Sequence, residues 1–387
     1  MTWIDEAWQR ISANAAKLIA AGSFPVWSDG PSWITVPYDQ RERGVLPHDG
    51  SWMVGDVAAI AWFAAWRGGS AAVTQQEALA VSRKLANRAG LTSFASVSHM
   101  FFRGTLVPQV IGKHAELAEL AAQAARTVAR RFTEIGYMKS FGEPADAQYL
   151  FTTVDDVINL VLPLWHAKQT GDTELETRLV DAAITIGDHV VRPDGSAAQV
   201  LLMSRDGAPA GVDTYQGHST AGCWSRGQAW GIYGYAMMYR VTRNPIFLDL
   251  ADAMASYWIK QVFDDPSPIW DFELRGRDGV VRDSFAASLA YAGILELADQ
   301  SPGPRRVELA GYCRTMAERL TRQYVLGVAA ADLGILSGAA LDVPHSHGIG
   351  SKVIVGDSYF TETIWRLTQL SDAGHSPTVL PSEQGSS

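Results

Sequence analysis

Cysteine, long apolar runs and clustered basic residues are all scarce in this chain. Among 387 residues the only cysteines are Cys223 and Cys313, and two lone thiols provide neither a disulfide framework nor a metal site. No run of about 18 apolar residues occurs, so we expect no membrane span. No run of Lys and Arg stands out and the formal net charge is −9, which argues against nucleic acid as a partner.

Targeting and metal-binding patterns are missing too. The opening MTWIDEAWQRISANAAKLIAAG has early acidic residues and no apolar segment behind a basic one, so it reads as an amphipathic helix and not as a signal peptide. The simplest location is the cytoplasm. There is no HExxH, no CxxC and no dense Asp array, so we expect no metal and no cofactor. Residues 376–387, SPTVLPSEQGSS, are expected to form a disordered tail.

The chain does contain a repeated helical format. Six apolar runs, each opened by Gly, Asp, Ser or His and carrying few charges, are expected to be buried helices: Ser51–Trp66, Ser98–Ile111, Thr153–Thr170, Ser225–Thr242, Asp283–Asp299 and Gly356–Leu370. Amphipathic helices are expected between them: Trp3–Ala21, Gln75–Arg88, Lys113–Phe132, Glu174–Val190, Pro245–Val262 and Arg305–Tyr324.

This alternation of outer and inner helices predicts an all-α fold. Six helical hairpins closed into a ring make an (α/α)6 barrel, and residues 1–375 form one domain because each inner helix needs both neighbours to cover it. Short hairpins are expected at the mouth near Gln199–Met203 and Gly279–Arg282. A two-domain α+β protein is the alternative.

The stretch Thr214–Tyr235, TYQGHSTAGCWSRGQAWGIYGY, concentrates polar and aromatic side chains in a short span. Its candidates for binding are Gln216, His218, Trp224, Arg226 and Trp230. Indole faces cover the apolar face of a pyranose, while Arg and Gln bind hydroxyls or a carboxylate. The segment therefore predicts a site for a small acidic sugar or oligosaccharide; a buried Trp-rich helix start with one satisfied Arg is the alternative.

Other polar residues open the inner helices and should converge at one mouth, where helix N-termini favour an anion. They are His48, Asp49, Trp52, His99, Asp155, Asp156, Asp283 and Asp357. Asp155 and Asp156 precede a strongly apolar helix, and such paired carboxylates favour a general acid. Asp283 and Asp357 occupy positions typical of helix N-caps. A further loop, with His345, His347, Ser351 and Lys352, is either an anion site or a solvated loop.

At these motifs the chain resembles the unsaturated glucuronyl hydrolases of glycoside hydrolase family 88. The resemblance runs from Phe24-Pro25 to about Leu370. It is carried by YQGHSTAGCWSRGQAWGIYGYA (Tyr215–Ala236), VDDVINLVLPLWHAKQTGD (Val154–Asp172), IWDFE (Ile269–Glu273), DSFAASLAYAGILELA (Asp283–Ala298) and VGDSYFTETIWRL (Val355–Leu367). It implies a cytoplasmic (α/α)6 barrel, in agreement with the helix pattern.

The resemblance also implies a reaction. The family removes a 4,5-unsaturated uronic acid from the non-reducing end of oligosaccharides: one Asp protonates the C4=C5 vinyl ether and activates the water that adds at C5, so the two-carboxylate rule of ordinary glycosidases does not apply. The motif of that Asp falls on Asp155, with Asn159 and Leu160 matching. The sugar-contacting residues of the family fall on Gln216, Trp224, Arg226 and Trp230.

Two departures from the family pattern leave alternatives open. The family has a His-Asp pair where this chain has His99-Met100, and an active-site His at about Ala198. Asp156 or Asp49 is a candidate replacement for the missing carboxylate. A lyase or an ordinary glycosidase using Asp155 with Asp156, Tyr215 or His218 is a second interpretation, and a non-catalytic sugar-binding relative is a third.

Overall fold

The computed structural model describes residues 2–39, 51–69, 73–132, 136–143, 148–327, 332–373 and 380. Helices dominate this part of the chain, and three small antiparallel sheets accompany them. The tail expected over residues 376–387 lies, apart from Leu380, outside the described residues, as do His48 and Asp49.

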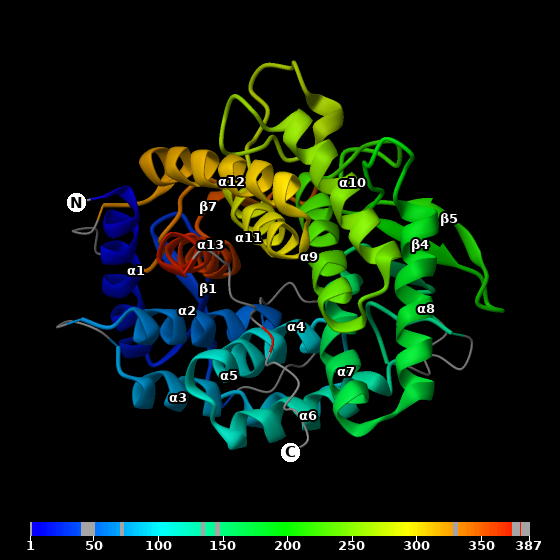
Figure 1. The fold of residues 1–387 in the computed structure, drawn as a ribbon, viewed down its shortest axis with the longest axis horizontal. Coiled ribbons are helices and arrows are strands. Elements are labelled where there is room, and N and C mark those ends of the chain that lie inside the picture. Colours follow the sequence, from blue (N-terminus) through cyan, green and yellow to red (C-terminus); the bar gives the residue numbers. More distant parts are fainter. Residues whose placement is uncertain are drawn as a thin grey trace.

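The outer helices each bury one face. They are α1 (Trp3–Ala20), α3 (Gln75–Arg83), α6 (Ala115–Ala129), α8 (Thr173–Val190), α10 (Pro245–Gln261) and α12 (Gly303–Tyr324). Side-chain caps set several of their starts: Thr2 with Asp5, and Thr74 with Glu77, form capping boxes. Figure 1 shows these helices around the outside of the molecule. Their bounds agree closely with the amphipathic stretches predicted from the sequence, except that α3 ends at Arg83 and not at the predicted Arg88.

The inner helices form a closed series of contacts. They are α2 (Val54–Arg67), α4 (Val97–Phe101) continued by the π-helical turn η4 (Phe102–Leu106) and α5 (Val107–Gly112), α7 (Asp156–Thr170), α9 (Ser225–Thr242), α11 (Ser284–Gln300) and α13 (Ile354–Ala373). Each packs on the next, and α13 packs on α2 (Figure 1). Glycines permit the closest approaches: a Cβ on Gly293 would lie 2.9 Å from Cα of Tyr233.

The second inner helix is not the continuous α-helix expected over Ser98–Ile111. Its middle turn is π-helical, a widening often found at functional sites. The turn carries Arg103, whose guanidinium is wholly buried against Asp56 of α2 and Ser358 and Glu362 of α13. Arg103 thereby joins three inner helices.

A line of buried charges of alternating sign extends from Arg103. Glu362 pairs with Arg366 at 2.9 Å, and Arg366 pairs with Glu296 of α11 at 2.6 Å. Glu296 then pairs with Arg240 of α9, which also reaches Asp299 at 2.7 Å. Because each charge faces an opposite one, the inner helices are joined by ionic contacts as well as by apolar packing.

The strands lie in connections between helices. β1 (Ser23–Asp29) pairs with β2 (Ser32–Pro37), β3 (Phe151–Thr153), β4 (Val200–Met203) and β5 (Pro209–Asp213) form a sheet in that order, and β6 (Ala339–Asp342) pairs with β7 (His347–Ser351). The hairpin predicted near Gln199–Met203 is present as β4 and β5. The one predicted at Gly279–Arg282 is absent: Arg282 makes only an isolated bridge with Ile269.

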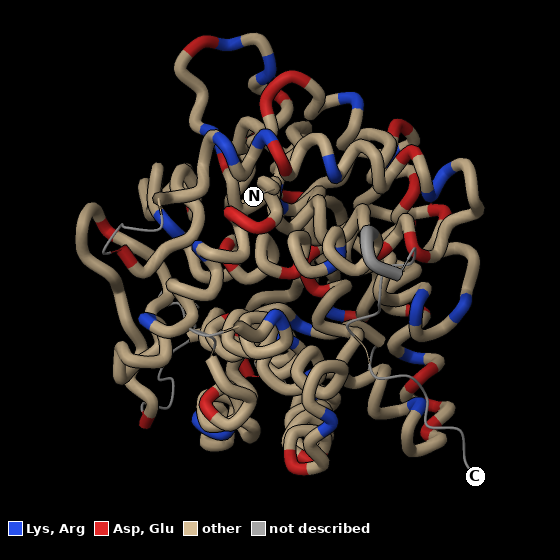
Figure 2. Tube along the Cα trace, turned by 60° about the vertical axis from the view of Figure 1, so that its left-hand side comes forward, with Lys and Arg blue, Asp and Glu red and all other residues tan. Residues whose placement is uncertain are grey.

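Charged side chains are distributed over the outer turns. Figure 2 shows Lys and Arg interspersed with Asp and Glu on the face it presents. Within the described residues no helix is both long enough and apolar enough to cross a membrane.

Candidate active site

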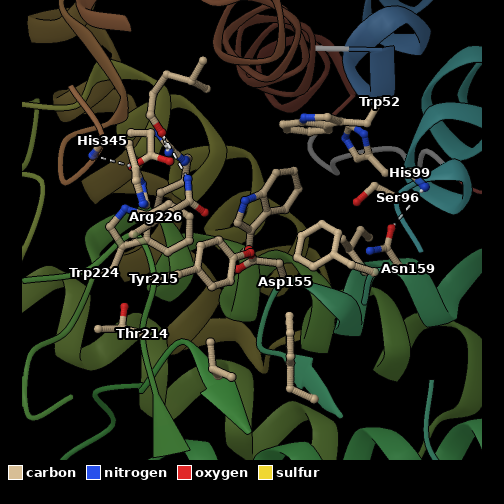
Figure 3. Close-up of a pocket in the computed structure, with 18 of the residues that line it drawn as sticks. Trp52, Ser96, His99, Asp155, Asn159, Thr214, Tyr215, Trp224, Arg226 and His345 are labelled. Atoms are coloured by element: carbon tan, nitrogen blue, oxygen red, sulfur yellow. Dashed lines mark hydrogen bonds and ion pairs between the residues drawn. The ribbon is translucent and has the colours of Figure 1, made fainter. Parts of the chain in front are cut away.

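A pocket of about 420 Å³ opens where several inner helices begin. It is lined by Trp27, Trp52, Met53, Ser96, His99, Phe141, Tyr149, Phe151, Asp155, Ile158, Asn159, Val200, Leu202, Asp213, Thr214, Tyr215, Gln216, Trp224, Arg226, Trp230, Leu341, Asp342, His345 and His347. Side chains from the starts of α4, α7 and α9, from β3 and β4, and from the β6–β7 connection meet there (Figure 3). The expected convergence is therefore seen for the starts of α2, α4, α7 and α9, whereas Asp283 and Asp357, at the starts of α11 and α13, do not line the pocket.

Asp155 stands at the start of α7 and lines the pocket. It occupies the N-cap position but makes no side-chain capping bond. Its Oδ1 is buried without a hydrogen-bond partner among the described residues. Burial, and then the charge of Asp156, raise the pKa of Asp155 to about 8, while Arg226 opposes the shift. Asp155 therefore carries a proton at neutral pH, as a general acid requires.

Asp156, its neighbour, has the opposite environment. Its Oδ2 accepts hydrogen bonds from Ser140, from Thr152 and from both the main-chain N–H and the hydroxyl of Thr153. Its Oδ1 accepts from Asn159 Nδ2 at 3.0 Å. Asp156 is absent from the pocket lining. It anchors the turn before α7 and acts on Asp155 through its charge, so the expectation that it replaces a missing pocket carboxylate is wrong.

Aromatic rings form the walls on either side of Asp155. Trp52, Trp224 and Trp230 all line the pocket as predicted, and Trp27 of β1 joins them. The edge of His99 meets Trp52 at 5.5 Å and Trp230 at 5.3 Å between ring centroids. Trp27 was not among the candidates, since a lone Trp in a strand carries no spacing signal.

His99 is a neutral, buried member of this wall. Burial and the neighbouring Arg103 lower the pKa of His99 to about 3. Its Nε2 lies 3.3 Å from the Tyr359 hydroxyl, and its Nδ1 lies 3.8 Å from Oδ2 of Asp56. Met100, the next residue, is wholly buried in the core and does not line the pocket. The position after His99 therefore supplies no polar group to the site.

Arg226 lines the pocket, and its positive charge is balanced by the carboxylate of Asp283. Its Nη1 lies 2.8 Å from Oδ2 of Asp283, and it also donates to the carbonyls of Ala340 and Leu341. The guanidinium stacks on Trp224, 4.6 Å from the ring centroid. Asp283 is at once the counter-ion and the N-cap of α11, accepting from Phe285 N at 3.1 Å. Its predicted capping role is confirmed.

Asp357 is not the N-cap that its position suggested. Helix α13 begins three residues earlier, at Ile354. The Asp357 carboxylate accepts from the main-chain N–H groups of Ile335 and Leu336 at 2.9 and 2.8 Å. It holds the connection before β6 in place and is not part of the pocket lining.

Gln199 is a site-building residue that the sequence did not reveal. Its Oε1 accepts from the Thr214 hydroxyl at 2.8 Å and from the main-chain N–H groups of Tyr215 and Gln216, both at 3.0 Å. Its Nε2 donates to Gln216 Oε1 at 3.1 Å. Ala198, the expected position of the family His, is buried and does not line the pocket. The neighbouring Gln199 holds the Thr214–Gln216 segment instead.

His218 does not reach the site. Its side chain is exposed and absent from the pocket lining. Its main-chain N–H donates to Asp271 Oδ2 at 2.8 Å, and its ring lies against the edge of Trp270. The structure therefore does not bring the side chain of His218, which was predicted to bind substrate, into the pocket.

The loop between β6 and β7 contributes only part of its predicted anion cluster. His345 and His347 line the pocket, and His345 Nδ1 lies 2.9 Å from Asp342 Oδ1. Ser351 and Lys352 do not line it, and Lys352 instead pairs with Asp332 at 2.6 Å. In the described part of the chain no three His, Cys, Asp or Glu side chains are grouped to hold a metal ion.

The comparison with known proteins agrees with the resemblance seen in the sequence. No family model matches the chain. The unsaturated glucuronyl hydrolase of Bacillus sp. (strain GL1) is 26% identical over 376 residues, which cover 93% of this chain and 96% of that protein. An unsaturated chondroitin disaccharide hydrolase of Streptococcus pyogenes serotype M1 is 27% identical over 261 residues, 66% of this chain and 65% of that protein.

Solved structures show the same fold. An unsaturated glucuronyl hydrolase specific for heparin superposes with a TM-score of 0.85 at 19% identity, over 97% of this chain and 99% of its own. The enzyme of Bacillus sp. GL1 superposes with a TM-score of 0.84 at 24% identity, over 99% of this chain and 100% of its own. The chain is thus a divergent relative of the unsaturated glucuronyl hydrolases.

Proposed function

We propose that this protein is a glycoside hydrolase that removes a 4,5-unsaturated uronic acid, or a related modified uronic acid, from the non-reducing end of oligosaccharides. We also propose that the ring of inner and outer helices is an (α/α)6 barrel and that residues 1–375 form a single catalytic domain. The named relatives and the order of the sequence motifs support both statements.

The observation that carries the proposal is the state of Asp155. A carboxyl group with a pKa of about 8, unpartnered on one oxygen and facing a pocket, is a proton donor at neutral pH. Ordinary glycosidases need a second carboxylate beside the acid. Asp156, the nearest in sequence, is occupied by its own hydrogen bonds, whereas hydration of a vinyl ether needs only the one group.

The residues around Asp155 take roles that follow from their chemistry. Trp224 and Trp230 cover the faces of the sugar ring, with Trp52 and His99 on the adjoining wall. Arg226 and Gln216 bind the polar groups of the sugar at their pocket-facing edges. Asp155 protonates C4 of the unsaturated ring, water adds at C5, and the resulting hemiketal opens and releases the rest of the oligosaccharide.

The setting of the reaction follows from the same resemblance. We propose a small acidic oligosaccharide as the partner and the cytoplasm as the location. Cys223 and Cys313 are free and buried thiols, which agrees with a reducing compartment.

The test measures the ultraviolet absorbance of the unsaturated uronate with purified protein and a panel of lyase-generated unsaturated disaccharides. Wild-type protein is expected to abolish the absorbance of at least one of them. Asp155→Asn is expected to lower the rate at least about 100-fold, because the general acid is lost. Asp181→Asn, on the exposed side of α8, is the control and should match wild type.

Other outcomes of this assay would contradict the proposal. A rise in absorbance on intact acidic polysaccharides would indicate a lyase. Release of a saturated sugar, with no change on unsaturated substrates, would indicate an ordinary glycosidase. Binding without turnover, unchanged in Asp155→Asn, would indicate a non-catalytic sugar-binding protein.

A further inference from the structure

Tyr215 faces the reacting end of the pocket from the wall beside Asp155. It follows β5 and precedes Gln216, and its ring lines the pocket. Figure 3 shows the Tyr215 and Asp155 side chains directed toward the same part of the cavity. The proposed hydration reaction does not use the Tyr215 hydroxyl.

The position of the Tyr215 ring is set by its surroundings. Its centroid lies 6.1 Å from that of Phe141 and 6.4 Å from that of Phe151. Its main-chain N–H is held by Gln199 Oε1 at 3.0 Å. A ring fixed at its backbone and along its flank presents its hydroxyl in one direction at little entropic cost on binding.

Electrostatics keep the Tyr215 hydroxyl protonated. Burial raises its pKa well above the ordinary value, and the charges of Asp155, Asp156 and Asp342 raise it further, against a smaller opposing effect of Arg226. The phenol is therefore a hydrogen-bond donor over the whole working pH range. The effect of Asp155 on Tyr215 also places the two groups within electrostatic reach of each other.

We propose that Tyr215 is a catalytic residue whose hydroxyl, together with the carboxyl group of Asp155, holds the water that adds to the unsaturated sugar. This inference rests on the proposed function.

The proton and electron balance of the step is complete without further reactants. Asp155 gives its proton to C4, and the oxygen of the held water forms a bond to C5 as the C4=C5 double bond is consumed. One proton of that water passes to the Asp155 carboxylate, which restores the acid. Tyr215 keeps its own proton throughout and only holds the water oxygen.

A tyrosine suits this position better than a carboxylate does. Met100 brings no polar group to the pocket, so a second partner for the water must come from elsewhere. Another negative charge beside Asp155 and Asp156 would raise the pKa of Asp155 still further. It would thereby weaken Asp155 as a proton donor, whereas a neutral phenol holds the water without that effect.

The kinetic test compares Tyr215→Phe with wild type on an unsaturated disaccharide. The variant keeps the ring and loses only the hydroxyl. We expect kcat to fall about 10- to 100-fold, as for loss of a hydrogen bond to a developing charge, with KM changed by less than about threefold. Tyr235→Phe is the matched control, because the Tyr235 hydroxyl bonds the Ala183 carbonyl at 3.2 Å in the core, away from the pocket lining.

A titration without substrate separates this inference from the proposed function. The carboxyl carbon of Asp155 is followed by NMR against pH in wild type and in Tyr215→Phe. The groups facing Asp155 are Asp156, Arg226 and Tyr215. In Tyr215→Phe the water proposed to bridge the two groups loses its hold on the phenol. Because a water donating to the carboxylate favours its ionised form, the pKa of Asp155 should rise and the alkaline limb of kcat should move to higher pH.

The outcomes discriminate between the two ideas. A wild-type protein that consumes no unsaturated sugar defeats the proposed function. A raised Asp155 pKa in Tyr215→Phe still supports a water shared by the two groups. An active wild type with Tyr215→Phe equal to it in kcat overturns the role of Tyr215. So does an Asp155 pKa that is the same in both proteins.

Discussion

Asp155 and Asp156 are adjacent in the chain, yet their carboxyl groups have different hydrogen-bond partners. The Asp156 carboxylate accepts hydrogen bonds at both oxygens and is fixed in the turn. Asp155 has an unpartnered buried oxygen and a pKa of about 8. Environments that differ in this way assign an acid role to one carboxyl group and a structural role to its neighbour.

A prediction at the residue scale concerns Asp156→Asn. The amide keeps the shape of the side chain but removes the negative charge that raises the pKa of Asp155. The pKa of Asp155 should fall toward its ordinary value, so the proton donor is lost at a lower pH. We expect the alkaline limb of kcat to move to lower pH, by about one unit or less.

The measurement is the pH profile of kcat for wild type and Asp156→Asn. Thermal unfolding of both proteins serves as the control, because the amide also replaces an acceptor of several hydrogen bonds. An alkaline limb that stays in place, in a variant that is folded, would show that Asp156 does not set the acidity of Asp155.

At the scale of the elements, the inner helices are joined by buried ion pairs. Glu362 of α13 pairs with both Arg103 and Arg366 and accepts from the Tyr233 hydroxyl at 3.0 Å. The π-helical turn exists where Arg103 must reach two other helices. The same arginine lowers the pKa of His99 in the pocket wall, so this network connects the packed inner helices to the site.

We predict that Glu362→Gln lowers the free energy of unfolding by about 3–5 kcal/mol, as expected when one partner of a buried ion pair is removed. Glu318→Gln is the matched control. Glu318 pairs with Arg322 at the same i,i+4 spacing as Glu362 with Arg366, but on the exposed side of α12. The control should cost less than about 1 kcal/mol.

Urea unfolding of wild type and of the two variants measures both changes in the free energy of unfolding. If the free energy of unfolding falls by the same amount in both variants, the ion pairs of the inner helices contribute no more to stability than a surface pair.

At the scale of the whole molecule, the active site should cost the protein stability at alkaline pH. Folding raises the pKa of Asp155 from 3.8 to about 8. Between about pH 4 and about pH 8 the folded state therefore binds more protons than the unfolded state. Because of this, the contribution of Asp155 to the free energy of unfolding falls as the pH rises through that window.

Asp155→Asn removes this dependence. The variant should match wild type in unfolding free energy near pH 4 and exceed it at pH 8, by an amount on the order of a few kcal/mol. Chemical denaturation at several pH values measures the difference between the two proteins, in which the contributions of His99 and of the other buried acids cancel. A difference that does not change with pH would contradict the raised pKa of Asp155.

The sequence alone determined the helical architecture and much of the site. Apolar and amphipathic runs alternate along the chain, and burial follows this local pattern, so helices α1 to α13 lie close to the predicted ranges. Asp155, His99, Trp52, Gln216, Trp224, Arg226 and Trp230 all line the pocket. All but Gln216 lie at or near the starts of inner helices, and Gln216 lies in the connection between β5 and α9. The distant resemblance to unsaturated glucuronyl hydrolases was also readable from ordered motifs.

Only the tertiary structure decided the environment of each side chain. His218 belongs to the strongest motif yet is exposed and does not line the pocket. Gln199 lies outside that motif, and its side chain holds the main chain of Tyr215 and Gln216. The ion pair between Arg226 and Asp283 joins two residues at the starts of different inner helices. Burial, charge pairing and pKa depend on neighbours brought together by folding, and neither the spacing nor the composition of a single segment contains them.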